Sequence, residues 1–189
     1  MTVAPLDPRR ARLTSGYGWR FNPTEFHAGI DLAAAIGEPV RAVRQGRVVV
    51  SAPSGALDRY GNVVVIEHPS GEASLYAHLD SRAVNRGDYV AENQPIGTVG
   101  TTAGTRTDPG KHFERSGAHL HLEILTRWPP KGRKLDRIDP TRLWPPAIAG
   151  RQPAHPERQQ TAPDAPQARQ GGAAWAMLAL LAALAMSRR

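Results

Sequence analysis

Apolar and polar residues alternate in short runs over most of the chain, from Leu13 to about Pro145. Gly, Pro, Asn and Asp separate these runs, as turns separate strands. No long window in this region carries the 3.6-residue periodicity of an amphipathic helix. The pattern therefore predicts an all-β domain over residues 14–146. The clearest runs span residues 39–52, 62–68, 73–78, 96–99 and 119–125.

The last of these runs carries two histidines. Strand alternation places His119, His121 and Glu123 on one face, and the Leu and Ile residues between them on the face toward the core. Two imidazoles separated by one residue form a preset pair, and imidazole is a common metal ligand. A half-buried strand whose polar face happens to carry two histidines is the alternative interpretation.

A weak internal repeat supports the β interpretation. Each copy has the form of a turn that enters a strand, followed by a second turn and strand. The repeat predicts two related β units packed against each other. The copies are Gly37-x-x-Val40 followed by Gly46-x-Val48, and Gly87-x-x-Val90 followed by Gly97-x-Val99.

Both ends of the chain differ from this domain. Residues 1–13 form an irregular lead-in without the apolar stretch of a standard secretory signal. Residues 147–170 are rich in Ala, Pro, Gln and Arg, which predicts a disordered tether. Residues 171–187 carry no charge, and the segment 171–189 ends in two arginines. Its length lies at the lower limit of a transmembrane helix, so it predicts a marginal C-terminal membrane anchor, with a docking helix as the alternative.

Composition narrows the possible partners. The chain has no cysteine, which excludes disulfides and thiolate metal sites. Its formal net charge is +7, and residues 127–142 hold six Lys or Arg against two Asp. Such a basic patch suits an anionic polymer, although a solvated loop explains it equally well. No aromatic platform, helix-turn-helix or zinc-finger spacing accompanies the patch, so nucleic acid is not an expected partner.

Two further stretches carry candidate chemistry. In residues 26–32, His27 and Asp31 are four positions apart and share a face on a strand or a helix, with Gly29 expected to leave room for an ion between them. An Asp that merely orients an unrelated His is the alternative. In residues 76–79, Tyr76 and His78 are expected to share a strand face.

Together these stretches suggest a catalytic metal site. His27, Asp31 and one histidine of the 119/121 pair would make three protein ligands, leaving the fourth tetrahedral position for water. The remaining histidine of the pair and His78 could transfer protons or hold a developing oxyanion. No His-Glu-x-x-His helix exists, so histidine would have to act as the base.

In these motifs the chain resembles the lysostaphin-type zinc endopeptidases, which cut the peptides of bacterial peptidoglycan. The resemblance implies an antiparallel β-sheet with an open groove over one Zn²⁺ ion held by His27, Asp31 and His121. It also implies that His119 is the base that activates the water, and that His78 polarises the scissile carbonyl or stabilises the tetrahedral intermediate. Glu123 is expected to support a ligand rather than to be one. The shared motifs, in chain order, lie at residues 15–20, 26–32, 37–40, 61–68, 76–79, 87–90, 94–97 and 119–123.

One segment departs from the family pattern. Residues 101–118 replace a compact Gly/Ser/Thr turn and are longer by about ten residues, which bears on substrate preference because such loops often carry specificity. His112 lies in this segment, where no strand alternation fixes it as a ligand. His68 is expected to pack at a strand end and His155 to lie in the tether.

The expected function is zinc-dependent hydrolysis of stem or cross-link peptides in peptidoglycan. A catalytically inactive module that binds cell wall or regulates another hydrolase is the alternative, and a metal-stabilised β domain unrelated to wall is a third. The cell envelope is the expected location, with residues 171–187 as a possible membrane contact. A phage or mobile-element protein for lysis or entry is also compatible with the sequence.

Overall fold

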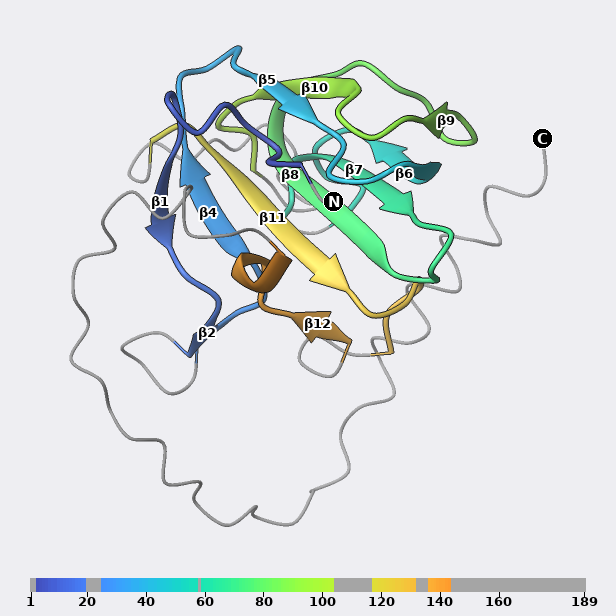
Figure 1. Ribbon diagram of the computed structural model, residues 1–189. Coiled ribbons are helices and arrows are strands. Elements are labelled where there is room, and N and C mark those ends of the chain that lie inside the picture. The colour runs from blue at the N-terminus through green and yellow to red at the C-terminus, as the bar shows by residue number, and fades with distance from the viewer. Residues whose placement is uncertain (1–2, 20–24, 58, 104–116, 132–135, 144–189) are drawn as a thin grey trace, which may run out of the picture. The chain divides into compact units, whose positions relative to one another are not determined.

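The computed structural model describes residues 3–19, 25–57, 59–103, 117–131 and 136–143. These residues form short strands and one 3-10 helix (Figure 1). The elements are β1 (Arg12–Ser15), β2 (Gly18–Trp19), β3 (Phe26–His27), β4 (Ile30–Ala33), β5 (Pro39–Arg41), β6 (Gly46–Ala52), β7 (Asn62–Glu67), β8 (Ala73–Arg82), β9 (Tyr89–Val90), β10 (Pro95–Val99), β11 (His119–Leu125), β12 (Arg137–Ile138) and η1 (Pro140–Leu143).

One antiparallel sheet dominates the described residues. Its strands follow the order β1-β4-β11-β8-β7-β6-β9, while β10 pairs with both β5 and β8, and β12 pairs with β11. Strands β2 and β3 form a separate two-stranded ribbon. In Figure 1 the long strand β11 lies between β4 and β8. The predicted all-β antiparallel architecture is confirmed.

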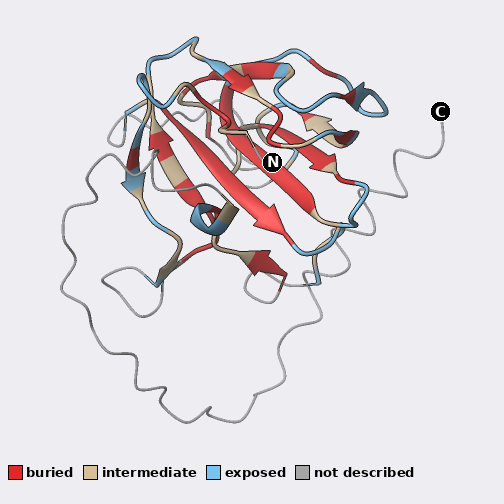
Figure 2. Cartoon of the chain, in the orientation of Figure 1, coloured by how far each residue is buried: buried red, intermediate tan, exposed pale blue. Residues whose placement is uncertain are grey.

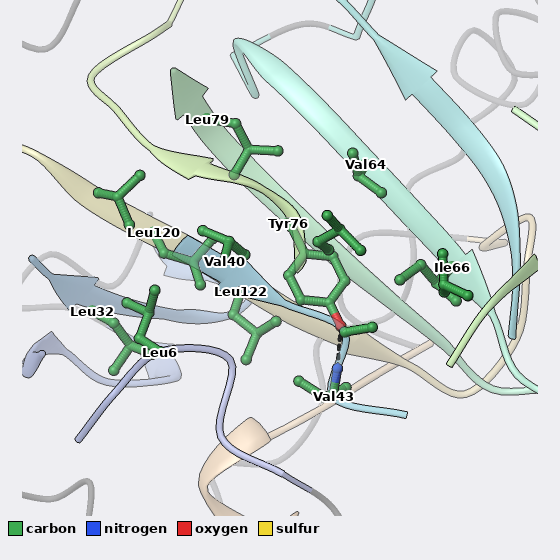
Figure 3. Close-up of a cluster of buried hydrophobic side chains, with 14 of the residues drawn as sticks. Leu6, Leu32, Val40, Val43, Val64, Ile66, Tyr76, Leu79, Leu120 and Leu122 are labelled. Carbon is green, nitrogen blue, oxygen red and sulfur yellow. Dashed lines mark hydrogen bonds between the residues drawn. The ribbon is translucent and has the colours of Figure 1, made fainter. Parts of the chain in front are cut away.

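Strand β11 is buried along its whole length (Figure 2). Leu120, Leu122 and Ile124 pack into the main core, as the alternation predicts. Figure 3 shows this core around Tyr76, whose hydroxyl accepts a hydrogen bond of 2.8 Å from the Val43 amide. A second, smaller cluster of buried apolar residues includes Leu75 and Leu125. Its side chains come from strands that also contribute to the main core. Because apolar residues fill the core side of β11, its polar residues must face the other way.

The internal repeat corresponds to a reciprocal pairing of strands. The first strand of each copy pairs with the second strand of the other, since β5 pairs with β10 and β6 pairs with β9. Gly46 and Gly97 occupy equivalent places in the two copies. A Cβ on Gly46 would lie 2.2 Å from the Glu67 carbonyl oxygen, and a Cβ on Gly97 would lie 2.4 Å from the Ser81 carbonyl oxygen. The two units therefore pack against each other as expected, with glycine required where each unit crosses a neighbouring backbone, while their relatedness stays a prediction.

Strand β8 contains a bulge that the sequence pattern does not reveal. Ala77 and His78 together oppose the single residue Val63 of β7, and His78 has a φ of 62°. The alternation of side chains slips there, so Tyr76 and Leu79 both lie in the main core while His78 does not. The expectation that Tyr76 and His78 share a face is wrong, because the bulge turns His78 away.

Several boundaries differ from the predicted runs. The run 39–52 is two strands, β5 and β6, and β8 continues to Arg82. Leu6 in the lead-in is buried in the main core. The predicted tether, 147–170, and the apolar segment, 171–189, lie outside the described residues. Within the part of the chain that the structure describes, no helix is long and apolar enough to span a bilayer.

Candidate metal centre

Three side chains from three strands, two in the main sheet and one in the β2–β3 ribbon, meet at one point. His27 ends β3, Asp31 lies on β4, and His121 lies on β11 directly opposite Asp31 in the strand register. His27 Nε2 is 3.1 Å from Asp31 Oδ1 and 3.1 Å from His121 Nδ1, and His121 Nδ1 is 2.8 Å from Asp31 Oδ1. The antiparallel pairing of β4 with β11 thus brings together residues that are 90 positions apart in the chain.

The geometry of these three atoms suits a small tetrahedral cation. An ion about 2.0–2.2 Å from each atom would hold them roughly 3.3–3.6 Å apart, slightly wider than the distances observed. His27 Nδ1 is 2.6 Å from the Gly16 carbonyl oxygen, and His121 Nε2 is 3.1 Å from Glu123 Oε1. Since the Gly16 and Glu123 oxygens accept hydrogen bonds, the ring protons lie on His27 Nδ1 and His121 Nε2. His27 Nε2 and His121 Nδ1 are left with lone pairs that can bind a metal. The residues therefore fit a zinc-type ion.

Gly29 does not leave room for the ion. A Cβ at this position would lie 2.2 Å from the Leu122 carbonyl oxygen and 3.0 Å from Glu123 Cγ. The expectation of open space at Gly29 is wrong. The glycine instead lets the chain entering β4 approach β11 closely enough for His27 to reach Asp31 and His121.

A buried charged cluster lies behind His121. Glu123 is 1% exposed and accepts hydrogen bonds of 2.8 Å from the Tyr60 hydroxyl and 2.6 Å from Arg137 Nε, in addition to the His121 contact. The predicted supporting position of Glu123 thus has a physical basis. Sequence reasoning did not identify Tyr60 or Arg137 as part of the site. Arg137 belongs to the basic stretch 127–142, but it is buried rather than part of a surface patch.

Electrostatics in the cluster favour charged carboxylates beside a basic imidazole. Burial opposes ionisation of Asp31, but hydrogen bonds from His121 and His27 outweigh it and hold the pKa of Asp31 well below its usual range. Burial is likewise outweighed at Glu123, where His121 and Arg137 lower the pKa to about 2. Asp31 and Glu123 in turn overcome the effect of burial on His121 and raise its pKa to about 9. A metal that binds here would therefore have to displace the proton that His121 carries.

Two further imidazoles complete the site. The ring of His78 lies 4.9 Å from that of His119 and 5.7 Å from that of His121, centroid to centroid. His78 Nδ1 is 2.9 Å from the Thr102 carbonyl oxygen, and His119 Nδ1 is 3.0 Å from the Gly117 carbonyl oxygen. Burial, followed by the charges of His121 and His119, lowers the pKa of His78 to about 3. His78 is therefore neutral near pH 7, with its proton on Nδ1 and a lone pair on Nε2.

Of the remaining histidines, the structure describes His68, which is not part of this group. His68 is buried, with Nδ1 2.9 Å from the Gln45 carbonyl oxygen and Nε2 3.0 Å from Ser74 Oγ. His112 and His155 lie outside the described residues. Within the described part of the chain, the cluster of His27, Asp31 and His121 is the one group of metal-ligating side chains close enough to hold an ion.

A fold and a site of this kind define a class of metallopeptidase, and comparison with known proteins identifies the family. The model of peptidase family M23 matches residues 25–137. The chain belongs to this family, the lysostaphin-type peptidases, whose members include peptidoglycan endopeptidases. The resemblance inferred from the motifs is thereby confirmed.

Relatives in the family have more than one role. The DD-carboxypeptidase/endopeptidase Mpg of Neisseria meningitidis is 39% identical over 107 residues, which cover 54% of this chain and 24% of Mpg. The murein hydrolase activator EnvC of Escherichia coli is 35% identical over 107 residues, covering 57% of this chain and 25% of EnvC. The chain thus spans about a quarter of the length of these relatives.

Solved structures share the same fold. A zinc-containing peptidase from Vibrio cholerae is 30% identical with a TM-score of 0.55, and the match covers 79% of this chain and 39% of that one. The catalytic domain of the antimicrobial peptidase lysostaphin from Staphylococcus simulans is 26% identical with a TM-score of 0.56, covering 70% and 91% of the two chains.

Proposed function

We propose that this protein is a zinc-dependent endopeptidase that hydrolyses stem or cross-link peptides of bacterial peptidoglycan. The observation that carries the proposal is the convergence of the ligand atoms of His27, Asp31 and His121, each within 3.1 Å of the others, beside the imidazoles of His78 and His119. A bound zinc ion would act as a Lewis acid on the peptide carbonyl and make an attacking water more acidic.

The chain's own residues would manage the protons of this reaction. The Nδ1–H of His119 is held by the Gly117 carbonyl, so its Nε2 is the atom that would accept a proton from the attacking water. After that transfer the same atom is a donor that can deliver the proton to the leaving amine. We assign His119 the role of general base on this ground.

His78 would act on the same substrate from the neighbouring position. Because Thr102 already accepts its Nδ1–H, neutral His78 presents an acceptor at Nε2 and becomes an oxyanion donor only after it gains a proton there. That proton would come from solvent, because the proton of the attacking water goes to His119, and negative charge developing on the carbonyl oxygen would favour its uptake. His78 is therefore assigned to stabilisation of the tetrahedral intermediate, as the protonated partner of His119.

A catalytically inactive regulator or wall-binding module is the second candidate, which the similarity to a murein hydrolase activator favours. The complete ligand set and both additional histidines support the enzyme instead, since a regulator has no chemical need for them. Removal of zinc with a chelator separates the two functions. Binding to purified peptidoglycan should survive in a regulator, whereas hydrolysis by an enzyme should stop.

The decisive experiment measures zinc content and release of peptide fragments from purified peptidoglycan by the full chain. Wild type is expected to bind one zinc ion and to release fragments, whose masses identify the bond that is cut. A zinc-loaded wild type that releases no fragment from peptidoglycans of several cross-link types would refute the proposal.

The family supports a location in the cell envelope, where peptidoglycan lies. We propose in addition that residues 171–187 attach the protein to a membrane. Deletion of residues 171–189 should shift the protein from the membrane fraction to the supernatant without loss of hydrolysis in solution. Equal partitioning of the full-length and truncated proteins would refute the anchor.

A further inference from the structure

His78 is held in an unfavourable backbone conformation. Its φ of 62° lies in the left-handed region, which costs a residue with a Cβ about 1–2 kcal/mol. Such strain persists only where the surroundings fix it, and it is concentrated at functional sites. The contacts that fix His78 therefore reveal which residues the site depends on besides its own histidines.

Contacts on three sides hold this bulge. The His78 amide donates a hydrogen bond of 2.8 Å to the Tyr60 carbonyl oxygen. The residue after His78 is held through its carbonyl oxygen. The Leu79 carbonyl oxygen accepts hydrogen bonds from Asn62 Nδ2 at 3.0 Å and from Thr102 Oγ1 at 2.7 Å. The ring itself is held by the Thr102 carbonyl oxygen. Thr102 thus contacts both the backbone and the imidazole of the bulge.

Asn62 and Thr102 also hold each other. The Asn62 amide donates to Thr102 Oγ1 at 3.0 Å, and the Asn62 side chain donates a second bond of 3.0 Å to the Asp80 carbonyl oxygen. Gly61 lies so close to Thr102 that a Cβ there would be 2.3 Å from the Thr102 carbonyl oxygen. The Thr102 carbonyl is consequently fixed in position by its own hydroxyl, by Asn62 and by the backbone of Gly61.

We propose that Thr102 and Asn62 are positioning residues that fix the ring of His78, so that its Nε2 faces the reacting centre. The hydroxyl of Thr102 places its carbonyl, and the carbonyl fixes the Nδ1–H tautomer and the orientation of His78. Neither residue touches the three ligand atoms, so zinc binding should not depend on them. The kinetic consequence rests on the proposed function, whereas the tautomer of His78 does not.

Thr102→Val tests this directly, because it removes the hydroxyl and keeps the shape of the side chain. In the zinc-loaded full chain we expect kcat on peptidoglycan fragments to fall about 10- to 100-fold, the effect of a small misplacement of a catalytic group. KM and zinc content should stay unchanged, and Thr102→Ser should restore kcat. Thr98→Val is the matched control, because the Thr98 hydroxyl bonds instead to Ser81 Oγ at 2.7 Å.

A second measurement does not depend on activity. Ring nitrogen–proton correlation spectra of the zinc-loaded protein should show His78 as the Nδ1–H tautomer in wild type and Thr102→Ser, and less of it in Thr102→Val. His119 should keep its tautomer, because Gly117 supplies its acceptor. Asn62→Ala should reproduce both the fall in kcat and the loss of the Nδ1–H tautomer of His78. This variant keeps the proposal testable if Thr102→Val fails to fold.

The outcomes separate the two proposals. Thr102→Val should have no further effect on kcat in a His78→Gln background, since it acts through that ring. The positioning role would be overturned by an equal loss of kcat in the wild-type and His78→Gln backgrounds. It would also be overturned if the His78 tautomer is unchanged in Thr102→Val, or if Thr102→Ser is as impaired as Thr102→Val. If the tautomer changes as expected but zinc-loaded wild type hydrolyses no peptidoglycan, the positioning role stands and the proposed function fails.

Discussion

The two halves of the site are built in different ways. The ligand half places His121 opposite Asp31 through regular antiparallel pairing of β11 with β4. The other half places His78 on a bulge and ties the rings of His78 and His119 to backbone carbonyls of Thr102 and Gly117. Strand register fixes the first half, and irregular backbone fixes the second.

On the proposed roles, this difference separates metal binding from proton transfer. Asp31 and His121 lie on paired strands of the main sheet and His27 on the adjoining ribbon, so the ligand atoms move only if these strands move, which suits a metal that must be held permanently. His78 and His119 are oriented from the two ends of one connection, between β10 and β11, so we expect their orientation to be sensitive to the positions of those ends. The halves should therefore respond differently to substitution.

The largest contrast is expected between the two histidines of β11. His121→Ala removes a ligand and should lower zinc affinity more than about 100-fold, beyond the loss caused by a supporting residue. His119→Ala should keep zinc and lower hydrolysis by about 10²- to 10⁴-fold, the range of general base catalysis. Zinc titration and fragment release measure the two effects. Loss of zinc in both variants would contradict the division of roles.

Glu123→Gln should weaken the ligand half without removing a ligand. Loss of the charge behind His121 should lower zinc affinity about 10- to 100-fold. It also leaves the buried Arg137 without its carboxylate, which should reduce the free energy of unfolding by on the order of 3 kcal/mol.

The double variant Glu123→Gln/Arg137→Met separates these two causes. Stability, measured by urea unfolding, should largely recover because no buried charge remains unpaired. Zinc affinity should not recover, because the carboxylate that supports His121 is still missing. Recovery of both quantities would mean that Glu123 acts only through the packing around Arg137.

A pH dependence should belong to the ligand half alone. The pKa of His121 is raised to about 9 in the folded metal-free protein, above about 6.5 for an unfolded chain. The folded state then binds the extra proton, so its stabilising effect is complete below pH 6.5 and is lost as pH rises toward 9. The free energy of unfolding with chelator present should fall by on the order of 2 kcal/mol over this window.

Zinc should abolish that dependence, since the metal takes the place of the proton on His121. Urea unfolding at several pH values, with chelator and with zinc, measures both cases. His121→Gln should show no loss of stability over the same window in the metal-free state. A metal-free wild type that gains stability from pH 6.5 to 9 would contradict the assignment.

The smallest effect tests the strain in the second half. Because His78 has a positive φ, His78→Gly should be more stable than His78→Ala by about 1 kcal/mol. Ala77 is the other residue of the bulge, but it does not have a positive φ and it pairs with His121 of β11, so Ala77→Gly should instead lower stability by about 0.5–1 kcal/mol. Thermal unfolding of these variants measures the opposite signs. A glycine that destabilises position 78 as it does position 77 would mean that the bulge is not strained.

Sequence reasoning predicted the ligand half because strand alternation is visible in side chains. The run 119–125 matches β11, and the core positions of Leu120, Leu122 and Ile124 follow from period-two alternation. The meeting of His27, Asp31 and His121 could be expected from residue types and the family resemblance together. Their register could not, because pairing between β4 and β11 depends on contacts across 90 positions.

The second half could not be predicted to the same extent. A bulge at His78 has no marker in the sequence, since the residue with positive φ is a histidine rather than a glycine. Arg137 looked like one more cation in a basic stretch, and only the fold pairs it with Glu123. Gly29 was correctly singled out but for the wrong reason, because the close approach of β11 is a property of tertiary structure.

The two carbonyls that orient His78 and His119 have a consequence for how such an enzyme could change. A carbonyl oxygen is present whatever the side chain, so the acceptor at each end is retained when the residues between them change. We therefore expect that exchange of residues 104–116 would alter substrate preference while His78 and His119 keep their acceptors at Thr102 and Gly117.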